Sequence, residues 1–431
     1  GGTLTLSALD FLTILSAGTV HLGTVSVDDG DGAAADGGTL GDAIDITAST
    51  INLFGDLTTA TGGGADGDIE LNGAVVLKPD TGNIITIDTS APSGNIDFSS
   101  TIDAETDDVE GLSIVAGTGT VAVTGKMGNT AKLDYLDVAS STSVSLSDTV
   151  SLGDGAENTS VAADLNAVNG VTLSEGLSSN NAIDINADSD GDGAGTLTLA
   201  ASKTLTTNGN SLDIEADDIS LGAGAAVTAT GAALTITVTN DQTIDLGESN
   251  GGDLVLLDAD LAKITAGTTE FITTGTTGNV TVDAVTDGNT ANLGTVTIDA
   301  GNLVTFDAGA ASVFNGGLIV EADDGIAINN NVTSTTGELN FNADADTDDA
   351  DDNDNIVIAT GLTLDAGTSI TLAAGASKTM SGVGTLNLTA NSDVTLNNSL
   401  TTAGATTIDA DNETTGNDGE FTIASGKTLN T

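Results

Sequence analysis

Aspartate-rich runs are the stretches of this sequence whose residue types and spacing are best suited to chemistry. Asp188-Ser-Asp190-Gly-Asp192-Gly193 matches the opening of a calcium loop, D-x-D-x-D-G, whose alternate carboxylates converge on one cation. An EF-hand would need a glutamate at the twelfth position, which here is Leu199, so an EF-hand is excluded. A denser run supplies further candidate ligands: Asp344, Asp346, Asp348, Asp349 and Asp351.

Calcium is the cofactor that these runs suggest, because hard oxygen ligands at alternate positions suit Ca²⁺. Two carboxylates about 4.8 Å apart repel each other by roughly 0.9 kcal/mol in water, and a bridging cation would remove that repulsion. The competing interpretation is a solvated loop in a salty medium, where charges are screened beyond about 8 Å. Nothing in the sequence makes a cofactor a requirement.

The acidic runs occupy equivalent places in a repeated block. In each copy an alternating apolar segment is followed by an acidic loop and then by a second alternating segment. Recurrence at this scale indicates a repeat architecture, and it favours a scaffold over an enzyme with a single site. We expect the loops of all copies to leave the fold at the same type of corner. The copies span 182–209, 339–367 and 406–431.

The formal net charge of −56 limits the partners of the chain. Its seven basic residues are all lysines, whereas nucleic-acid binding needs a basic footprint and bidentate phosphate recognition uses arginine. Neither nucleic acid nor an anionic membrane surface is therefore expected as a partner. No apolar run approaches the roughly 20 residues of a membrane span, so membrane insertion is not expected either. Without cysteine there is neither a disulfide nor a thiolate metal site.

Catalysis is also not expected. Polysaccharide-cleaving enzymes built on a β-helix would need paired carboxylates in a groove and aromatic platforms for sugars. The chain has no tryptophan and no arginine, and its single histidine, His21, accompanies no recognisable nucleophile motif. We therefore predict that the protein is not an enzyme.

Short strands are indicated throughout by apolar residues at alternate positions. The residues between them are Thr, Ser, Asp and Asn, so one side of each strand is apolar and the other is wet. No stretch has sustained helical spacing, and the chain is predicted to be all-β. Clear examples are 4–6, 44–46, 112–114, 121–123, 197–199, 212–214, 234–238, 280–282, 326–328, 386–388 and 394–396.

Strands this short need many neighbours to form a stable sheet. A parallel β-solenoid supplies them by stacking each coil on the last, about 4.8 Å apart. The stretches 318–344 and 386–411 match at a nearly constant offset, which suits three coils of roughly 22 residues each. A sandwich or a propeller should show hairpin signals such as Asn-Gly, and these occur only sporadically.

A longer repeat overlies the coils. Gly-Gly-Thr-Leu-Thr-Leu at 1–6 matches Gly-Gly-Asp-Leu-Val-Leu at 251–256. We therefore divide the chain into a first solenoid superrepeat, 1–250, and an incomplete second one, 251–431, and we expect the two to stack as one continuous, elongated rod. Because repeats run to both ends of the sequence, we also expect an excerpt from a longer protein.

The run from Gly67 to Val138 is similar to the repeats of filamentous-haemagglutinin-like surface proteins of bacteria. The matching elements include Gly-Asn-Ile-Asp-Phe at 94–98, Leu-Ser-Ile at 112–114 and Ala-Gly-Thr-Gly at 116–119. This resemblance implies a secreted, right-handed parallel β-helix that extends from a cell and adheres or self-associates.

Together these features predict a structural, non-catalytic segment of an extracellular filament or giant cell-surface adhesin. In this role the chain is a rigid repetitive stalk. Its expected partners are further copies of itself, assembled end to end, or further coils of the same giant chain, with a surface receptor or glycan as an additional candidate. The alternative is a calcium- or glycan-binding β-helix module, and a polysaccharide-cleaving β-helix enzyme is a distant third.

Overall fold

The structure is a computed structural model that describes residues 4–7, 12–28, 43–60, 67–91, 94–154, 161–346, 353–413 and 419–431. The chain forms two compact units, and each is described by itself. Unit 1 comprises residues 1–216 and 220–230, and unit 2 comprises 217–219 and 231–431. The superrepeat boundary near residue 250 and the stacking of the superrepeats into one rod stay predictions.

Unit 1 is a stack of coils that adds short strands to three parallel sheets, which we name faces 1a, 1b and 1c in chain order. Face 1a contains β1 (Leu4–Ser7), β4 (Val25–Asp28), β6 (Leu57–Ala60), β8 (Ile84–Asp88), β11 (Gly111–Val115), β13 (Leu136–Ser140), β16 (Val161–Asn166), β19 (Ala182–Asn186) and β22 (Leu212–Glu215). Face 1b contains β2 (Leu12–Leu15), the first halves of β5 (Ile44–Leu53) and β7 (Ile69–Leu77), β9 (Ile96–Phe98), β12 (Thr120–Val123), β14 (Ser143–Leu146), β17 (Val171–Leu173) and β20 (Thr196–Leu199). Face 1c contains β3 (Thr19–Leu22), the second halves of β5 and β7, β10 (Ile102–Ala104), β15 (Val150–Ser151), β18 (Leu177–Ser178) and β21 (Thr204–Thr206). Strands β23 (Asp218–Leu221) and β24 (Ala226–Val238) contain residues of both units.

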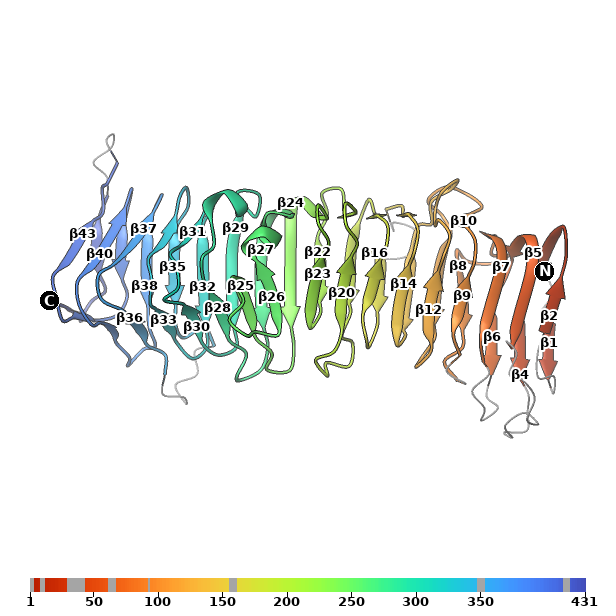
Figure 1. Cartoon of the computed structure of the whole chain (residues 1–431), viewed down its shortest axis with the longest axis horizontal. Helices are drawn as coiled ribbons and strands as arrows, with labels where there is room; N and C mark the ends of the chain where they lie inside the picture. Colours follow the sequence, from red (N-terminus) through yellow and green to blue (C-terminus); the bar gives the residue numbers. More distant parts are fainter. Residues whose placement is uncertain are drawn as a thin grey trace. The chain divides into compact units, whose positions relative to one another are not determined.

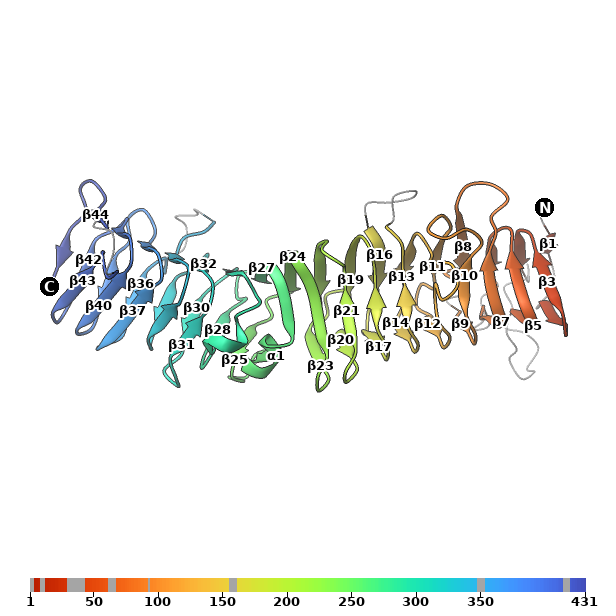
Figure 2. The same cartoon turned by 90° about the horizontal axis from the view of Figure 1, so that it is seen from above.

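Unit 2 repeats this plan with faces 2a, 2b and 2c. Face 2a contains the end of β24, β27 (Ile264–Thr273), β29 (Thr295–Ala300), β32 (Leu318–Ala322), β35 (Leu339–Asn342), β38 (Ile370–Ala373), β41 (Val394–Leu396) and β44 (Phe421–Ile423). Face 2b contains β25 (Ile244–Gly247), β26 (Leu254–Leu257), β28 (Val280–Val282), β30 (Val304–Phe306), β33 (Ile326–Ile328), β36 (Ile356–Ile358), β39 (Met380–Gly382), β42 (Leu400–Thr402) and β45 (Leu429–Asn430). Face 2c contains β31 (Ser312–Phe314), β34 (Val332–Ser334), β37 (Leu362–Ala366), β40 (Leu386–Ala390) and β43 (Thr406–Asp409). One helical turn, α1 (Asp258–Leu261), lies beside β25 in Figure 2, and a 3₁₀ turn, η1, covers Asp287–Asn289.

The prediction of an all-β parallel β-solenoid is confirmed. The strand pairings named above are parallel, and apart from β25–β26, which a short connection links, they join one coil to the next. Each alternating stretch named from the sequence lies within a strand. The right-handed sense of the coil is the usual one for parallel crossover connections and stays a prediction here.

The alternate apolar residues of each strand stack on those of the neighbouring coils and form ladders. On face 1b, Ile96 pairs with Val121, Val121 with Val144, Val144 with Val171 and Val171 with Leu197. All five side chains are buried. The strands that carry them, β9 to β20, lie side by side in Figure 1 and Figure 2. Each coil therefore rests its apolar side chains on those of the next, and burial contributes about 1.5–3 kcal/mol per side chain.

The coils are less uniform in length than the sequence suggested. Met380 pairs with Leu400 across a short coil, whereas Leu339 pairs with Ile370 across a much longer one. One period of the sequence repeat, from Leu339 to Thr406, advances the chain by eight strands, from β35 on face 2a to β43 on face 2c. Because three strands make one coil, this stretch is two and two-thirds coils, and the expectation of three short, equal coils is wrong.

Glycines line one corner of unit 1, where the chain turns from face 1a to face 1b. A Cβ on Gly94 would overlap the backbone of Gly67, and a Cβ on Gly119 would overlap the carbonyl of Gly94. Backbones of successive coils therefore approach closely at this corner, and only glycine fits.

We expect Gly119→Ala to destabilise unit 1 by about 1–3 kcal/mol, because the new methyl group must displace the Gly94 carbonyl of the neighbouring coil. Thermal and urea unfolding would measure the loss. Gly288→Ala is the control, because nothing lies within 4 Å of the Cβ that it would add. Equal stability of the two variants would contradict this account of the corner.

We expect Leu146→Ala, in the middle of face 1b, to destabilise the protein by about 2–5 kcal/mol through the cavity that it leaves. Each coil contacts only its neighbours, so hydrogen exchange should accelerate mainly in β12, β14 and β17. Val383→Ala, at a side chain that is 64% exposed, serves as the control. Uniform acceleration across unit 1 would contradict the local account.

Candidate functional site

The first acidic loop connects β19 on face 1a to β20 on face 1b. The structure brings the three predicted ligands together: one carboxylate oxygen each from Asp188, Asp190 and Asp192 lies within 4.8 Å of the other two. Gly191 and Gly193 have φ values of 64° and 84°, a left-handed conformation that lets the loop fold back on itself. The glycines of the D-x-D-x-D-G motif therefore have a structural reason.

Asp188 is the buried member of this group, and its neighbours fix its orientation. Its backbone N–H donates to Asn186 Oδ1 (3.1 Å), and its Oδ2 accepts from the N–H of Gly193 (3.2 Å). Burial raises the pKa of the Asp188 carboxyl, the hydrogen bond from Gly193 opposes that rise, and the charges of Asp190 and Asp192 add to it. The loop thus disfavours the charged form of the Asp188 carboxyl.

The second predicted loop, between β35 and β36, is described in part. Asp344 is half-buried, with its N–H donating to Asn342 Oδ1 (3.4 Å), and Asp346 is exposed. Asp348, Asp349 and Asp351 lie outside the described residues, so a calcium site here stays a prediction.

Asp354, at the end of the same run, has a different partner. Its side chain is fully buried, and Lys378 Nζ lies 3.7 Å from its Oδ2 in an ion pair between neighbouring coils. The charge of this aspartate is therefore balanced by a lysine.

The acidic loops do not leave the fold at one type of corner, which corrects the expectation from the sequence. In unit 2 the loop of the second copy joins face 2a to face 2b, whereas that of the third copy joins β43 on face 2c to β44 on face 2a. The physical reason is the non-integral number of coils between the copies.

A second cluster of carboxylates was not predicted from the sequence. Asp108, Asp134 and Asp154 each place one carboxylate oxygen within 4.8 Å of the other two. Asp108 Oδ1 accepts from the Asp154 N–H (2.9 Å), and this carboxyl occupies the space that a Cβ on Gly153 would need. These aspartates come from separate segments, so no local motif announces the group.

A ladder of aspartates along face 1a was also missed. Asp137 pairs with Asp164, Asp164 with Asp184, and Asp184 with Asp213, each one coil from the last. The pKa of Asp184 is raised to about 6, first by desolvation and then by the negative charges of Asp164, Asp213 and Glu215. The stacking that helps apolar residues therefore penalises these charges.

The Asp184 shift predicts how stability depends on pH. Folding favours the protonated form of the Asp184 carboxyl, because its pKa is higher in the folded state than in the unfolded state. The contribution of this carboxyl to the stability of the fold is therefore full below the unfolded pKa of about 3.9, and it is lost as pH rises through about 6. Asp184→Asn should therefore stabilise the protein by about 1 kcal/mol near pH 7, a figure reduced for solvent screening of this exposed residue. Near pH 4 it should have little effect.

Thermal unfolding across this pH range would measure the difference. Glu248→Gln, which removes one negative charge from an exposed residue outside the ladder, is the control for net charge. If both variants gain the same stability at each pH, the ladder has no specific effect.

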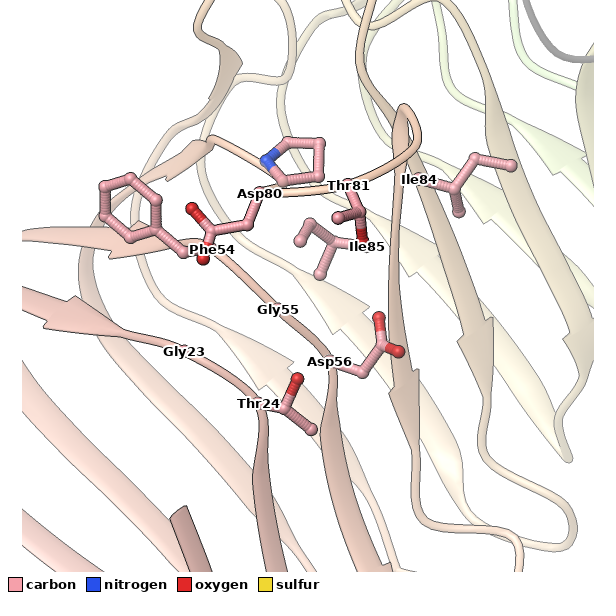
Figure 3. A pocket seen from close by; sticks show the side chains of 10 residues that line it. Gly23, Thr24, Phe54, Gly55, Asp56, Asp80, Thr81, Ile84 and Ile85 are labelled. Carbon is pink, nitrogen blue, oxygen red and sulfur yellow. The ribbon is translucent and has the colours of Figure 1, made fainter. Parts of the chain in front are cut away.

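A small hollow opens where three successive coils of unit 1 turn from face 1c to face 1a. Its volume is about 250 Å³, and Figure 3 shows Thr24, Asp56 and Asp80 around it, with Phe54 at one side. Asp56 Oδ1 accepts from the N–H of Thr86 (2.8 Å), so this carboxylate holds β8 in place. Ligand pockets commonly measure about 300–1,000 Å³, and the hollow falls below that range.

Comparison with known proteins found no match: no protein-family model, no curated protein and no solved structure is significantly similar to the chain. The similarity to filamentous-haemagglutinin-like repeats therefore stays a prediction. Across the described ranges, no helix has both the length and the apolar character to cross a membrane.

Proposed function

We propose that this protein is a structural, non-catalytic segment of an extracellular filament or giant cell-surface adhesin, in which stacked coils form a rigid repetitive stalk. Its partners are coils of the same kind, supplied by another copy or by the same giant chain. The observation that carries the proposal is the continuous stacking of parallel coils, in which buried apolar ladders pass from each strand to the next.

The apolar side chains of the last described strands are more exposed than the residues with which they pair in the preceding coil. Phe421 on β44 is 39% exposed, whereas its partner Val394 on β41 is fully buried. Ile408 and Leu429 are likewise half-buried, although the ladders they continue, through Leu388 and Leu400, are buried. A further coil in register would bury these side chains.

The backbone at this end supports the same occupant. Among the described strands, β43, β44 and β45 each pair along one edge only. Unpaired N–H and C=O groups on a parallel edge offer a template for another strand. A coil of the same design would form hydrogen bonds with these backbone groups and would also bury the apolar side chains. A partner with another fold would match fewer of both.

The net charge of the chain supports a role as a solvent-exposed stalk. The net charge of −56 favours solubility and opposes sideways aggregation of like chains. Association through an apolar, hydrogen-bonding end therefore competes well with association through the acidic sides.

We expect the chain to self-associate in a concentration-dependent way, and Phe421→Lys to weaken this association about tenfold or more, because a buried charge replaces a buried ring. Sedimentation velocity at several concentrations would measure it. Val383→Lys is the matched control, because Val383 is 64% exposed but follows β39, away from the last strands.

Equal weakening by both substitutions would show that net charge, rather than the end of unit 2, governs association. A chain that stays monomeric at every concentration would contradict self-assembly. Compact, non-filamentous assemblies in electron micrographs would contradict end-to-end stacking.

The alternative, a calcium- or glycan-binding module, predicts a defined ligand bound tightly at one mutable site. The carboxylate group at Asp188 favours calcium over a glycan as that ligand.

A further inference from the structure

Asp188 carries a buried carboxylate oxygen that no described protein group satisfies. The residue is 1% exposed, and while Oδ2 accepts from Gly193, Oδ1 has no hydrogen-bond partner among the described residues. A buried charged oxygen without a partner is strongly destabilising, so such oxygens are normally hydrogen-bonded, paired or bound to a metal.

Two neighbouring carboxylates make the environment of the Asp188 carboxylate still less favourable. Asp190 and Asp192 are largely exposed, yet each brings a carboxylate oxygen within 4.8 Å of that of Asp188. The Asp192 N–H donates to Asp190 Oδ1 (3.4 Å), which bends the two side chains into one turn. Three like charges at this separation repel one another, and the repulsion grows where one of them is shielded from water.

We propose that the loop 188–193 binds one Ca²⁺, with Asp188 Oδ1 and one oxygen each from Asp190 and Asp192 as carboxylate ligands. Water and backbone carbonyls complete the six to eight oxygens that Ca²⁺ takes. The ion satisfies the orphan oxygen of Asp188 and replaces the mutual repulsion of the three carboxylates by attraction.

Calcium suits this loop better than magnesium. Mg²⁺ demands near-ideal octahedral geometry and releases its water reluctantly, whereas Ca²⁺ accepts irregular sets of oxygens. The ligands come from a single short turn with one buried and two exposed carboxylates, which is an irregular and partly open set. Extracellular calcium modules bind Ca²⁺ with a Kd of about 10⁻⁴–10⁻³ M, and we expect this partly open site to fall in that range.

The loop is tied to the coils on both sides, so the ion stabilises more than the turn itself. The Ser189 N–H donates to the carbonyl of Ala167 in the preceding coil (2.9 Å), and the Ala187 N–H donates to that of Glu215 in the following coil (2.8 Å). Binding to the folded loop therefore raises the stability of this part of unit 1 by mass action.

The test uses the full chain and calcium itself. Isothermal titration calorimetry and thermal melts in CaCl₂ and in MgCl₂, at ionic strength held constant with NaCl, should show saturable Ca²⁺ binding and a rise in Tm of about 2 °C or more. Asp190→Asn/Asp192→Asn should lower the Ca²⁺ stoichiometry by one, or weaken that site at least tenfold. Both substitutions lie on exposed side chains, so the variant should fold.

The control variant, Asp148→Asn/Glu248→Gln, removes the same two charges outside the loop and should keep the full stoichiometry. Loss of one site in the loop variant alone supports the proposal. Unchanged stoichiometry in the loop variant, or Tm shifts that are equal in CaCl₂, MgCl₂ and NaCl at matched ionic strength, overturns it. Neither result depends on self-association, so this test and that of the stalk can fail separately.

Discussion

Parallel hydrogen bonding between successive coils is the constraint on which the rest of the structure depends. It holds neighbouring strands about 4.8 Å apart, so a residue within a strand lies beside its partner one coil away, apart from register shifts such as that between β11 and β13. Val121 contacts Ile96 below and Val144 above for this reason. The same rule explains why Gly119 must be glycine, since its neighbour across the coil boundary is a backbone carbonyl. Regularity here follows from backbone geometry, and the side chains adapt to it.

The same constraint acts on charge, where stacking is unfavourable. Some carboxylates are relieved by neutral donors one coil away: Ser113 Oγ–H donates to Asp137 Oδ2 (2.7 Å), and Asn186 Nδ2–H donates to Glu215 Oε1 (3.0 Å). Asp184 lies between two other aspartates, Asp164 and Asp213, and its pKa is raised to about 6 by burial and then by the charges of these neighbours. The acidic composition thus makes the surface soluble while it lowers the stability of the stack near neutral pH.

Much of the fold could be predicted from the sequence, because the period-two pattern of strands such as β20 is a local property. The loop 188–193 could be predicted for the same reason, since its ligands are neighbours in sequence. The group formed by Asp108, Asp134 and Asp154 could not, because coils differ in length and the register across coils is not written in any short motif. The buried position of Asp188 could not be predicted either, since it depends on how the coils on both sides close over the loop.

The mismatch between the sequence repeat and the coil has a geometric consequence. A block of eight strands advances the chain by two full turns and then by two of the three faces, so tandem copies are related by a screw operation rather than by a translation. In unit 2 this operation moves the acidic loop from one edge of the three-faced coil to another. Duplication of such a block winds its loops around the axis, and successive loops of like charge are kept apart without any change in their sequence.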